Sequence, residues 1–148
     1  MKPQKIRSHC PVNFVLEIFG DKWSLLILRD IVFRGKKTYG DFLKSEEKFA
    51  TNILATRLEM LEAEGILKKT PAPEDARKIH YLLTEKGLDL IPILFEMVLW
   101  SDKYDPNSES KRIPELVRLI QKDNRSVSER SKDYVRDGVP IVAKYLKR

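Results

Sequence analysis

The chain has 148 residues, of which 42% are hydrophobic and 34% charged, and it carries a formal net charge of +6. This length suits one domain with an extension rather than two ordinary domains. The composition excludes a disordered chain, and the single cysteine excludes an intramolecular disulfide and a cysteine-cluster metal site.

The first helices are expected before residue 65, and in chain order they cover residues 12–20, 22–33, 38–45 and 51–64. Local signals support them. Pro11 precedes the first helix and Asp21 suits the N-cap of the second. Thr38 and Asp41 have the spacing of a capping box, and Gly65 ends the fourth helix. Together these features predict a mainly helical start.

The fourth helix has an apolar face opposite a polar face that carries few charges. Leu54, Leu58 and Leu61 share one side at about 100° per residue. The opposite side holds Asn52, Ala55, Thr56, Glu59 and Ala63. With the third helix this makes a helix-turn-helix, whose second helix enters the major groove.

Three residues of this helix suit contact with DNA. Asn52 can bond adenine through two hydrogen bonds, and Thr56 can bond a base or contact the methyl group of thymine. Arg57 flanks the apolar stripe, where it reads a guanine or holds a phosphate. We therefore predict that Asn52 and Thr56 specify bases.

A β-hairpin is expected directly after the fourth helix. Residues 66–70 and 78–84 are short β-prone runs, and the segment 71–77 between them is rich in turn formers. The cations of the hairpin are expected to contact phosphate or a minor groove. They are Lys68, Lys69, Arg77 and Lys78.

Two residues after the second helix leave alternatives open. Lys36, next to Lys37, is either a solvated turn residue or a phosphate contact. Tyr39 either caps an edge of the core or bonds a phosphate. Both are kept as candidate DNA contacts.

A long helix is expected over residues 85–104, behind Thr84. Its apolar positions exceed what one small core covers, so a partner surface is expected. Pro92 lacks an amide donor and clashes with the carbonyl group of Leu88, which predicts a kink at residues 88–92. Its longest apolar run is shorter than the ~20 residues of a membrane span. No signal peptide is recognised either, so we expect a cytoplasmic protein that does not enter a membrane.

The positive charge is concentrated beyond this helix. Residues 1–105 hold 17 Lys and Arg against 16 Asp and Glu, whereas residues 106–148 hold 11 against 6. An argument for DNA binding must therefore come from local geometry. The predicted fold class is mainly α with a small β-hairpin: a winged helix-turn-helix domain with dimerisation helices over 1–105, followed by a helical extension over 106–148.

Three segments resemble the signature stretches of HxlR-type transcriptional regulators, in the same order. They are CPVNFVLEIFGDKWSLLILRDI, ATNILATRLEMLEAEGIL and IHYLLTEKGLDLIPIL, and the resemblance covers roughly residues 10–104. The resemblance implies a winged-helix homodimer related to MarR-type regulators. Such proteins bind double-stranded operator DNA and usually repress a neighbouring or divergent gene.

The resemblance also implies which residues act. The DNA-reading helix maps onto Thr51 through Leu61, the wing onto 66–83, and the dimer contacts onto 11–19 and 84–104. The expected DNA contacts are Lys36, Tyr39, Thr51, Asn52, Ala55, Thr56, Arg57, Lys68, Lys69, Arg77 and Lys78. The expected dimer contacts are Val12, Val15, Phe19, Leu88, Ile91, Leu94, Phe95 and Val98. The extension exceeds the usual family length, and three roles stay open for it: dimer contact, DNA contact or modulation of binding.

Cys10 is a candidate redox sensor. The start of a helix, together with Arg7 and His9, favours its thiolate, and some HxlR-type members sense oxidants or electrophiles through this cysteine. The alternative is a small buried hydrophobe. A small molecule at the dimer interface is the other expected effector.

The residues predict no enzyme. Two histidines, one cysteine and no glycine-rich phosphate loop leave no recognisable catalytic centre, metal site or cofactor. The alternative function is a winged helix that binds a protein through its long apolar helix and basic tail. Asn52, Thr56 and the wing cations favour DNA.

Overall fold

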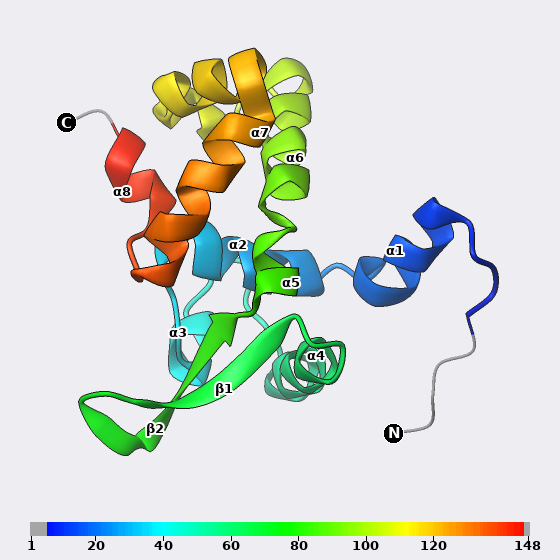
Figure 1. Ribbon diagram of the computed structural model, residues 1–148, viewed down its shortest axis with the longest axis vertical. Coiled ribbons are helices and arrows are strands. Elements are labelled where there is room, and N and C mark those ends of the chain that lie inside the picture. Colours follow the sequence, from blue (N-terminus) through cyan, green and yellow to red (C-terminus); the bar gives the residue numbers. More distant parts are fainter. Residues whose placement is uncertain (1–5, 147–148) are drawn as a thin grey trace.

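The computed structural model describes residues 6–146 as helices arranged around one hairpin (Figure 1). The elements are α1 (Pro11–Phe19), α2 (Ser24–Arg34), α3 (Tyr39–Leu43), α4 (Thr51–Ala63), β1 (Leu67–Ala72), β2 (Asp75–Leu83), α5 (Glu85–Leu88), α6 (Ile91–Tyr104), η1 (Glu109–Arg112), α7 (Pro114–Arg136) and α8 (Ile141–Tyr145). The hairpin and α4 lie at one end, α6 and α7 extend toward the other, and α1 projects to the side. The predicted fold class is confirmed.

The helix boundaries follow the local signals in the sequence. The Asp21 carboxylate accepts hydrogen bonds at 2.8 Å from the backbone amides of Trp23 and Ser24, and so caps α2. Thr38 and Asp41 form the expected capping box on α3. Gly65 follows α4 with φ of 72°, a left-handed conformation that favours glycine.

The hairpin is longer than expected, and the predicted loop over 71–77 was wrong. The strands pair antiparallel and leave only residues 73–74 between them, with a register shift between Pro71 and Ala72. Because the sheet has two strands, both are edges, and a proline is tolerated next to an irregularity. The hairpin is tied to the turn after α2, because the amide of Tyr81 donates to the carbonyl group of Lys37 at 2.7 Å.

The expected long helix is divided in two, at the place where a kink was predicted. α5 ends at Leu88 and α6 begins at Ile91. Pro92 lies in the first turn of α6, where a missing amide donor removes no helical hydrogen bond. The chain therefore changes direction between the wing and α6.

One core joins the winged helix to the C-terminal extension. α7 packs along α6, and α8 packs on α2. Among the most deeply buried side chains are Ile27, Leu28, Leu54, Leu58, Leu61, Ile91, Phe95, Leu116, Ile120 and Ile141. The extension therefore covers apolar surface that the sequence assigned to a partner.

This arrangement corrects several expected dimer contacts. Phe19, Leu88, Ile91, Leu94 and Phe95 are buried in the core of their own chain. Val98 is partly buried against the same core. The reason is that α7 occupies one side of α6, a neighbour that the apolar pattern of α6 alone does not reveal.

A buried carboxylate organises the region between α2 and α3. Asp30 is fully buried and accepts hydrogen bonds from Arg29 at 2.8 Å and Lys36 at 3.1 Å, and from the hydroxyl of Ser45. Lys36 also donates to Ser45 at 2.8 Å. These bonds fasten the turn after α2 to the end of α3.

We expect Asp30→Ala to lower the free energy of unfolding by about 3 kcal/mol, because it leaves buried donors without their acceptor. Urea unfolding followed by circular dichroism measures the change. The control is Glu109→Ala, whose side chain is 63% exposed and lies 3.8 Å from Arg34; such surface pairs contribute little. Equal loss in the two variants would contradict the assigned role of Asp30.

Candidate nucleic-acid interface

Helix α4 is held with one face inward and the other outward. Leu54, Leu58 and Leu61 bury the inner face. The hydroxyl group of Tyr39 donates to the carbonyl group of Thr51 at 3.0 Å and so fastens α3 to the start of α4. The outer face is thereby presented on a rigid support, beside the hairpin (Figure 1).

The outer face carries short, mostly uncharged side chains. The exposed residues are Thr51, Asn52, Ala55, Thr56, Glu59 and Ala63. The hydroxyl of Thr56 donates to the carbonyl group of Asn52 at 2.8 Å, which leaves its methyl group and lone pairs for an outside partner. The Asn52 side chain makes no hydrogen bond within residues 6–146, so its donor and acceptor are both available.

Arg57 lies on the flank of α4 and not on this outer face. Its Nη1 atom is 3.6 Å from the Asp21 carboxylate and 3.5 Å from the sulfur of Met60. Its Nε atom is buried without a hydrogen-bond partner among the described residues. Arg57 therefore braces α4 against the start of α2, a position that favours support over base reading.

Three more of the predicted contacts are engaged within the protein. Lys36 bonds Asp30 and Ser45, and the hydroxyl of Tyr39 bonds the backbone of α4. Lys69 lies 3.2 Å from Glu62 of α4. Contact with phosphate would require each of these groups to share or exchange its partner.

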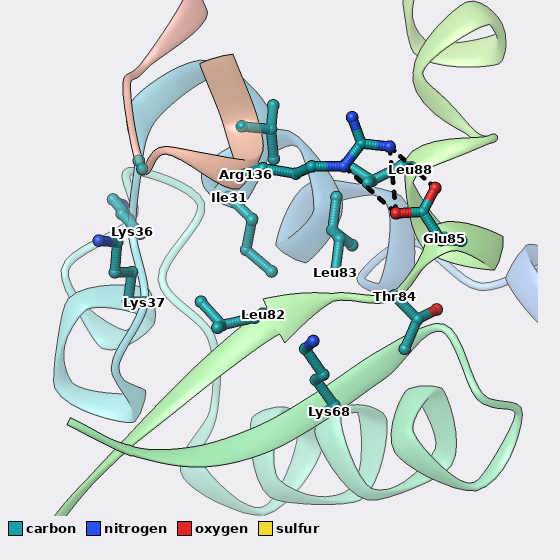
Figure 2. A pocket seen from close by; sticks show the side chains of 13 residues that line it. Ile31, Lys36, Lys37, Lys68, Leu82, Leu83, Thr84, Glu85, Leu88 and Arg136 are labelled. Atoms are coloured by element: carbon teal, nitrogen blue, oxygen red, sulfur yellow. Dashed lines mark hydrogen bonds and ion pairs between the residues drawn. The ribbon is translucent and has the colours of Figure 1, made fainter. Parts of the chain in front are cut away.

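The cations of the wing differ in what surrounds them. The side chain of Arg77 is 91% exposed and lies 3.1 Å from Asp75, and Lys78 is exposed with no ion pair among residues 6–146. Lys68 differs, because it extends from β1 to the side opposite α4 and lines a cavity (Figure 2). Among the predicted wing cations, Arg77 and Lys78 are therefore best placed to meet a DNA backbone.

Lys44 and Lys48 were missed by the sequence reasoning. Both are exposed around the turn that leads into α4. The neighbouring Glu47 is paired with Arg29, whose hydrogen bonds lower the pKa of Glu47 to about 2. This pairing offsets the negative charge of Glu47 beside the two lysines. Because 18 residues separate the two partners, no local pattern reveals it.

Two helices carry apolar side chains that are exposed. We call these two sets the apolar faces of α1 and α6. They are Val12, Phe14, Val15 and Leu16 on α1, and Ile93, Met97, Trp100 and Tyr104 on α6. Of the predicted dimer contacts, Val12 and Val15 belong to the apolar face of α1.

Cys10 lies at the start of α1 and is exposed, not buried. The nearby backbone amides of Asn13 and Val12 lower the pKa of its thiol below the ordinary value. Amides at a helix start stabilise a thiolate in this way. The thiol is therefore accessible and more readily ionised than an isolated cysteine.

Neither a cluster of metal-binding side chains nor a membrane span is present in the part of the chain that the structure describes. Residues 6–146 contain no group of three or more His, Cys, Asp or Glu side chains placed to hold a metal ion. No helix in the same range is long and apolar enough to cross a membrane.

The fold and this outer face define a class of protein. A helix-turn-helix made by α3 and α4, followed by a hairpin, is the arrangement of winged helix-turn-helix DNA-binding domains. A family model described as "HxlR-like helix-turn-helix" matches residues 18–109. The chain belongs to this family, and it is a transcriptional regulator with a helix-turn-helix DNA-binding fold.

Known relatives of this chain are also named as regulators. An uncharacterized HTH-type transcriptional regulator of Synechocystis, sll1512, is 34% identical over 88 residues, which are 60% of this chain and 64% of that protein. Another from Bacillus subtilis, YybR, is 33% identical over 116 residues, 78% of this chain and 92% of that one. The structure of the redox regulator HypR in its oxidized form has a TM-score of 0.56 and 32% identity, covering 64% of this chain and 96% of HypR.

Proposed function

We propose that the protein is a homodimeric repressor that reads operator DNA with the outer face of α4. The observation that supports this proposal is that Asn52 and Thr56 are exposed on this face, whereas Arg57 lies on the flank of α4 beside Asp21. A side-chain amide can make two hydrogen bonds to adenine, and a threonine methyl can contact thymine. Thr51 and Ala55 are small enough to let the helix approach the bases closely.

Cations around this face supply affinity that does not depend on sequence. Arg77 and Lys78 of the wing would contact the DNA backbone on one side of α4, and Lys44 and Lys48 would contact it near the turn before α4. Such contacts set the register of the protein on the duplex, whereas base contacts specify the sequence. The operator is thus held by the wing and turn and read by α4.

The dimer is proposed to form through the apolar faces of α1 and α6. Val12 is 66% exposed and Trp100 is 68% exposed, and exposed apolar faces of this kind mark an interaction site. Two copies of α4 would then enter major grooves about 34 Å apart on a pseudo-palindromic site. Bound in this way over a promoter, the dimer would block transcription.

We expect Asn52→Ala to weaken binding to the operator about tenfold and to leave binding to random duplex unchanged, because the lost contact is to a base.

Lys78→Gln is expected to weaken binding to operator and to random duplex equally, because its contact is to a phosphate. It should also reduce the slope of log affinity against log salt by about 0.9. Fluorescence anisotropy on the duplex upstream of the protein's own gene, with random duplex as competitor, measures both.

The matched control for this comparison is Lys122→Gln, which removes the same charge from an exposed position on α7. Equal effects of Asn52→Ala on operator and random DNA would contradict base reading by α4. If the wild-type protein binds neither the upstream duplex nor any of a wider set of genomic fragments more tightly than random duplex, the alternative function as a protein-binding module is favoured instead.

We expect Trp100→Glu to convert a dimer into a monomer, because a charge at the centre of an apolar contact cannot be solvated there. Light scattering after size-exclusion chromatography measures the mass in solution. Ile79→Glu is the control, since Ile79 is an exposed apolar residue of the wing. A Trp100→Glu protein that stays dimeric would place the interface elsewhere.

Cys10 is proposed to adjust repression in response to oxidants. The exposed thiol and its lowered pKa support this role, and the HypR relative is named as a redox regulator. Hydrogen peroxide would transfer one oxygen to the thiolate, giving sulfenic acid and hydroxide. Because the reaction needs the thiolate, alkylation of Cys10 by iodoacetamide should rise with pH through a midpoint below that of the unfolded chain.

Peroxide is expected to change the operator affinity of the wild-type protein severalfold and to leave Cys10→Ser unchanged. Anisotropy before and after treatment measures the affinity, and dimedone labelling followed by mass spectrometry detects the sulfenic acid. An identical response in Cys10→Ser would end the proposal for this residue.

A further inference from the structure

We propose that a cavity behind the wing binds a small organic carboxylate with an apolar body and thereby adjusts the position of the wing. The cavity has a volume of about 330 Å³ and lies between the hairpin, the turn after α2 and the end of α7 (Figure 2). It lies within one chain, apart from the apolar faces of α1 and α6. The regulatory part of this inference rests on the proposed reading of DNA; the binding site does not.

The floor of the cavity is apolar. It is lined by Ile31 of α2, Leu82 and Leu83 of β2, Leu88 of α5 and Val135 of α7. Figure 2 shows the labelled members of this set grouped between the hairpin and Arg136. Such a floor favours a hydrocarbon group over a phosphate ester or a sugar, because polar groups buried there would lack partners.

Two lysines at the cavity carry charge that the protein does not balance locally. Lys37 and Lys68 line it, and neither forms an ion pair within the described part of the chain. The neighbouring Lys36 is paired with Asp30, and Arg136 makes a fork with the Glu85 carboxylate at 2.9 and 3.1 Å. The cavity therefore has two available ammonium groups, which favour an anion.

A glycine of the extension makes room for one of these ammonium groups. A Cβ atom on Gly138 would lie 2.6 Å from Nζ of Lys37 and 3.1 Å from its Cε atom. The end of the Lys37 side chain thus lies beside the backbone of Gly138, in the turn between α7 and α8. The extension, and not the helix-turn-helix alone, positions this charge.

The size of the cavity limits its occupant. Ligand sites range from about 300 to 1,000 Å³, and this one is at the small end. A nucleotide or a peptide would not fit, whereas a carboxylate with about six carbon atoms would. Its carboxylate would be attracted by the positive charges of Lys37 and Lys68, and its hydrocarbon part would cover the apolar floor.

An occupant would contact both the wing and the extension. Lys68 and Leu82 are partners across the two strands of the wing, and Val135 and Gly138 belong to the end of α7 and the turn after it. A ligand held between them would restrain the hairpin against α7. Linkage makes this effect reciprocal. If the ligand changes the affinity of the protein for its operator by some factor, the operator changes the affinity of the protein for the ligand by the same factor.

The binding site is tested on the full chain with hexanoate as the probe. Titration of protein labelled at Ile, Leu and Val methyl groups should give saturable NMR shifts at Ile31, Leu82, Leu88 and Val135. 1-Hexanol lacks the charge and inorganic phosphate lacks the apolar body. Each should bind at least about tenfold more weakly than hexanoate. Absence of saturable shifts, or equal binding of hexanoate and either comparison compound, would overturn the site.

Lys37→Gln and Lys68→Gln should each weaken hexanoate binding, by up to about tenfold, because each removes a positive charge that attracts the carboxylate. Lys122→Gln is the matched control and should bind hexanoate as the wild type does. Thermal melts check that the variants fold. Unchanged binding in both folded cavity variants would also overturn the assignment.

The effect on the wing is tested separately, by operator anisotropy with and without saturating hexanoate. A change of about threefold or more that is lost in Lys37→Gln supports the coupling, and an unchanged affinity overturns it. The NMR titration contains no DNA. Its failure therefore cannot be confused with a failure of DNA recognition.

Discussion

The winged helix depends on a buried carboxylate at the middle of α2. An ionised group without water is stable only when hydrogen-bonded and paired, so Asp30 draws Arg29, Lys36 and Ser45 around itself. These bonds fix the turn after α2, whose next residue, Lys37, accepts the hydrogen bond from β2. One constraint therefore sets where α3 begins, where the hairpin attaches, and which lysine of the turn is left for other contacts.

Local chemistry explains what could be predicted from the sequence. The cap at Asp21, the capping box at Thr38 and the left-handed residue at Gly65 each act within a few residues, and the outer face of α4 follows from helical period. The hairpin was recognised, but its loop was placed too long because turn-forming residues also occupy strand ends. Boundaries set by pairing across a sheet do not appear in a local pattern.

Which cations are available could not be predicted in the same way. Counting charges treats Lys36, Arg57 and Lys78 alike, yet the first is bonded to a buried carboxylate and the second lies against the cap of α2, while the third is exposed. The apolar surplus of α6 poses the same problem. A helix that is apolar on two sides needs two neighbours, and its own sequence does not say that α7 takes one side and leaves Trp100 on the other.

The extension is held unequally at its two ends, and this favours regulation at the wing. Along α6 it buries Leu116 and Ile120, contacts that cannot open without exposing the core. Near the wing the end of α7 is joined through Arg136 to Glu85 of α5 and through Lys132 to Asp89, pairs with exposed partners that are worth ~0–1 kcal/mol each. The next apolar anchor of the extension is Ile141, which is buried where α8 packs on α2. The cavity lies beside the weaker pairs, so a few contacts from a small anion would be comparable in strength to them. The same contacts made where the extension packs on α6 would change the position of the extension little, because the buried contacts there are much stronger.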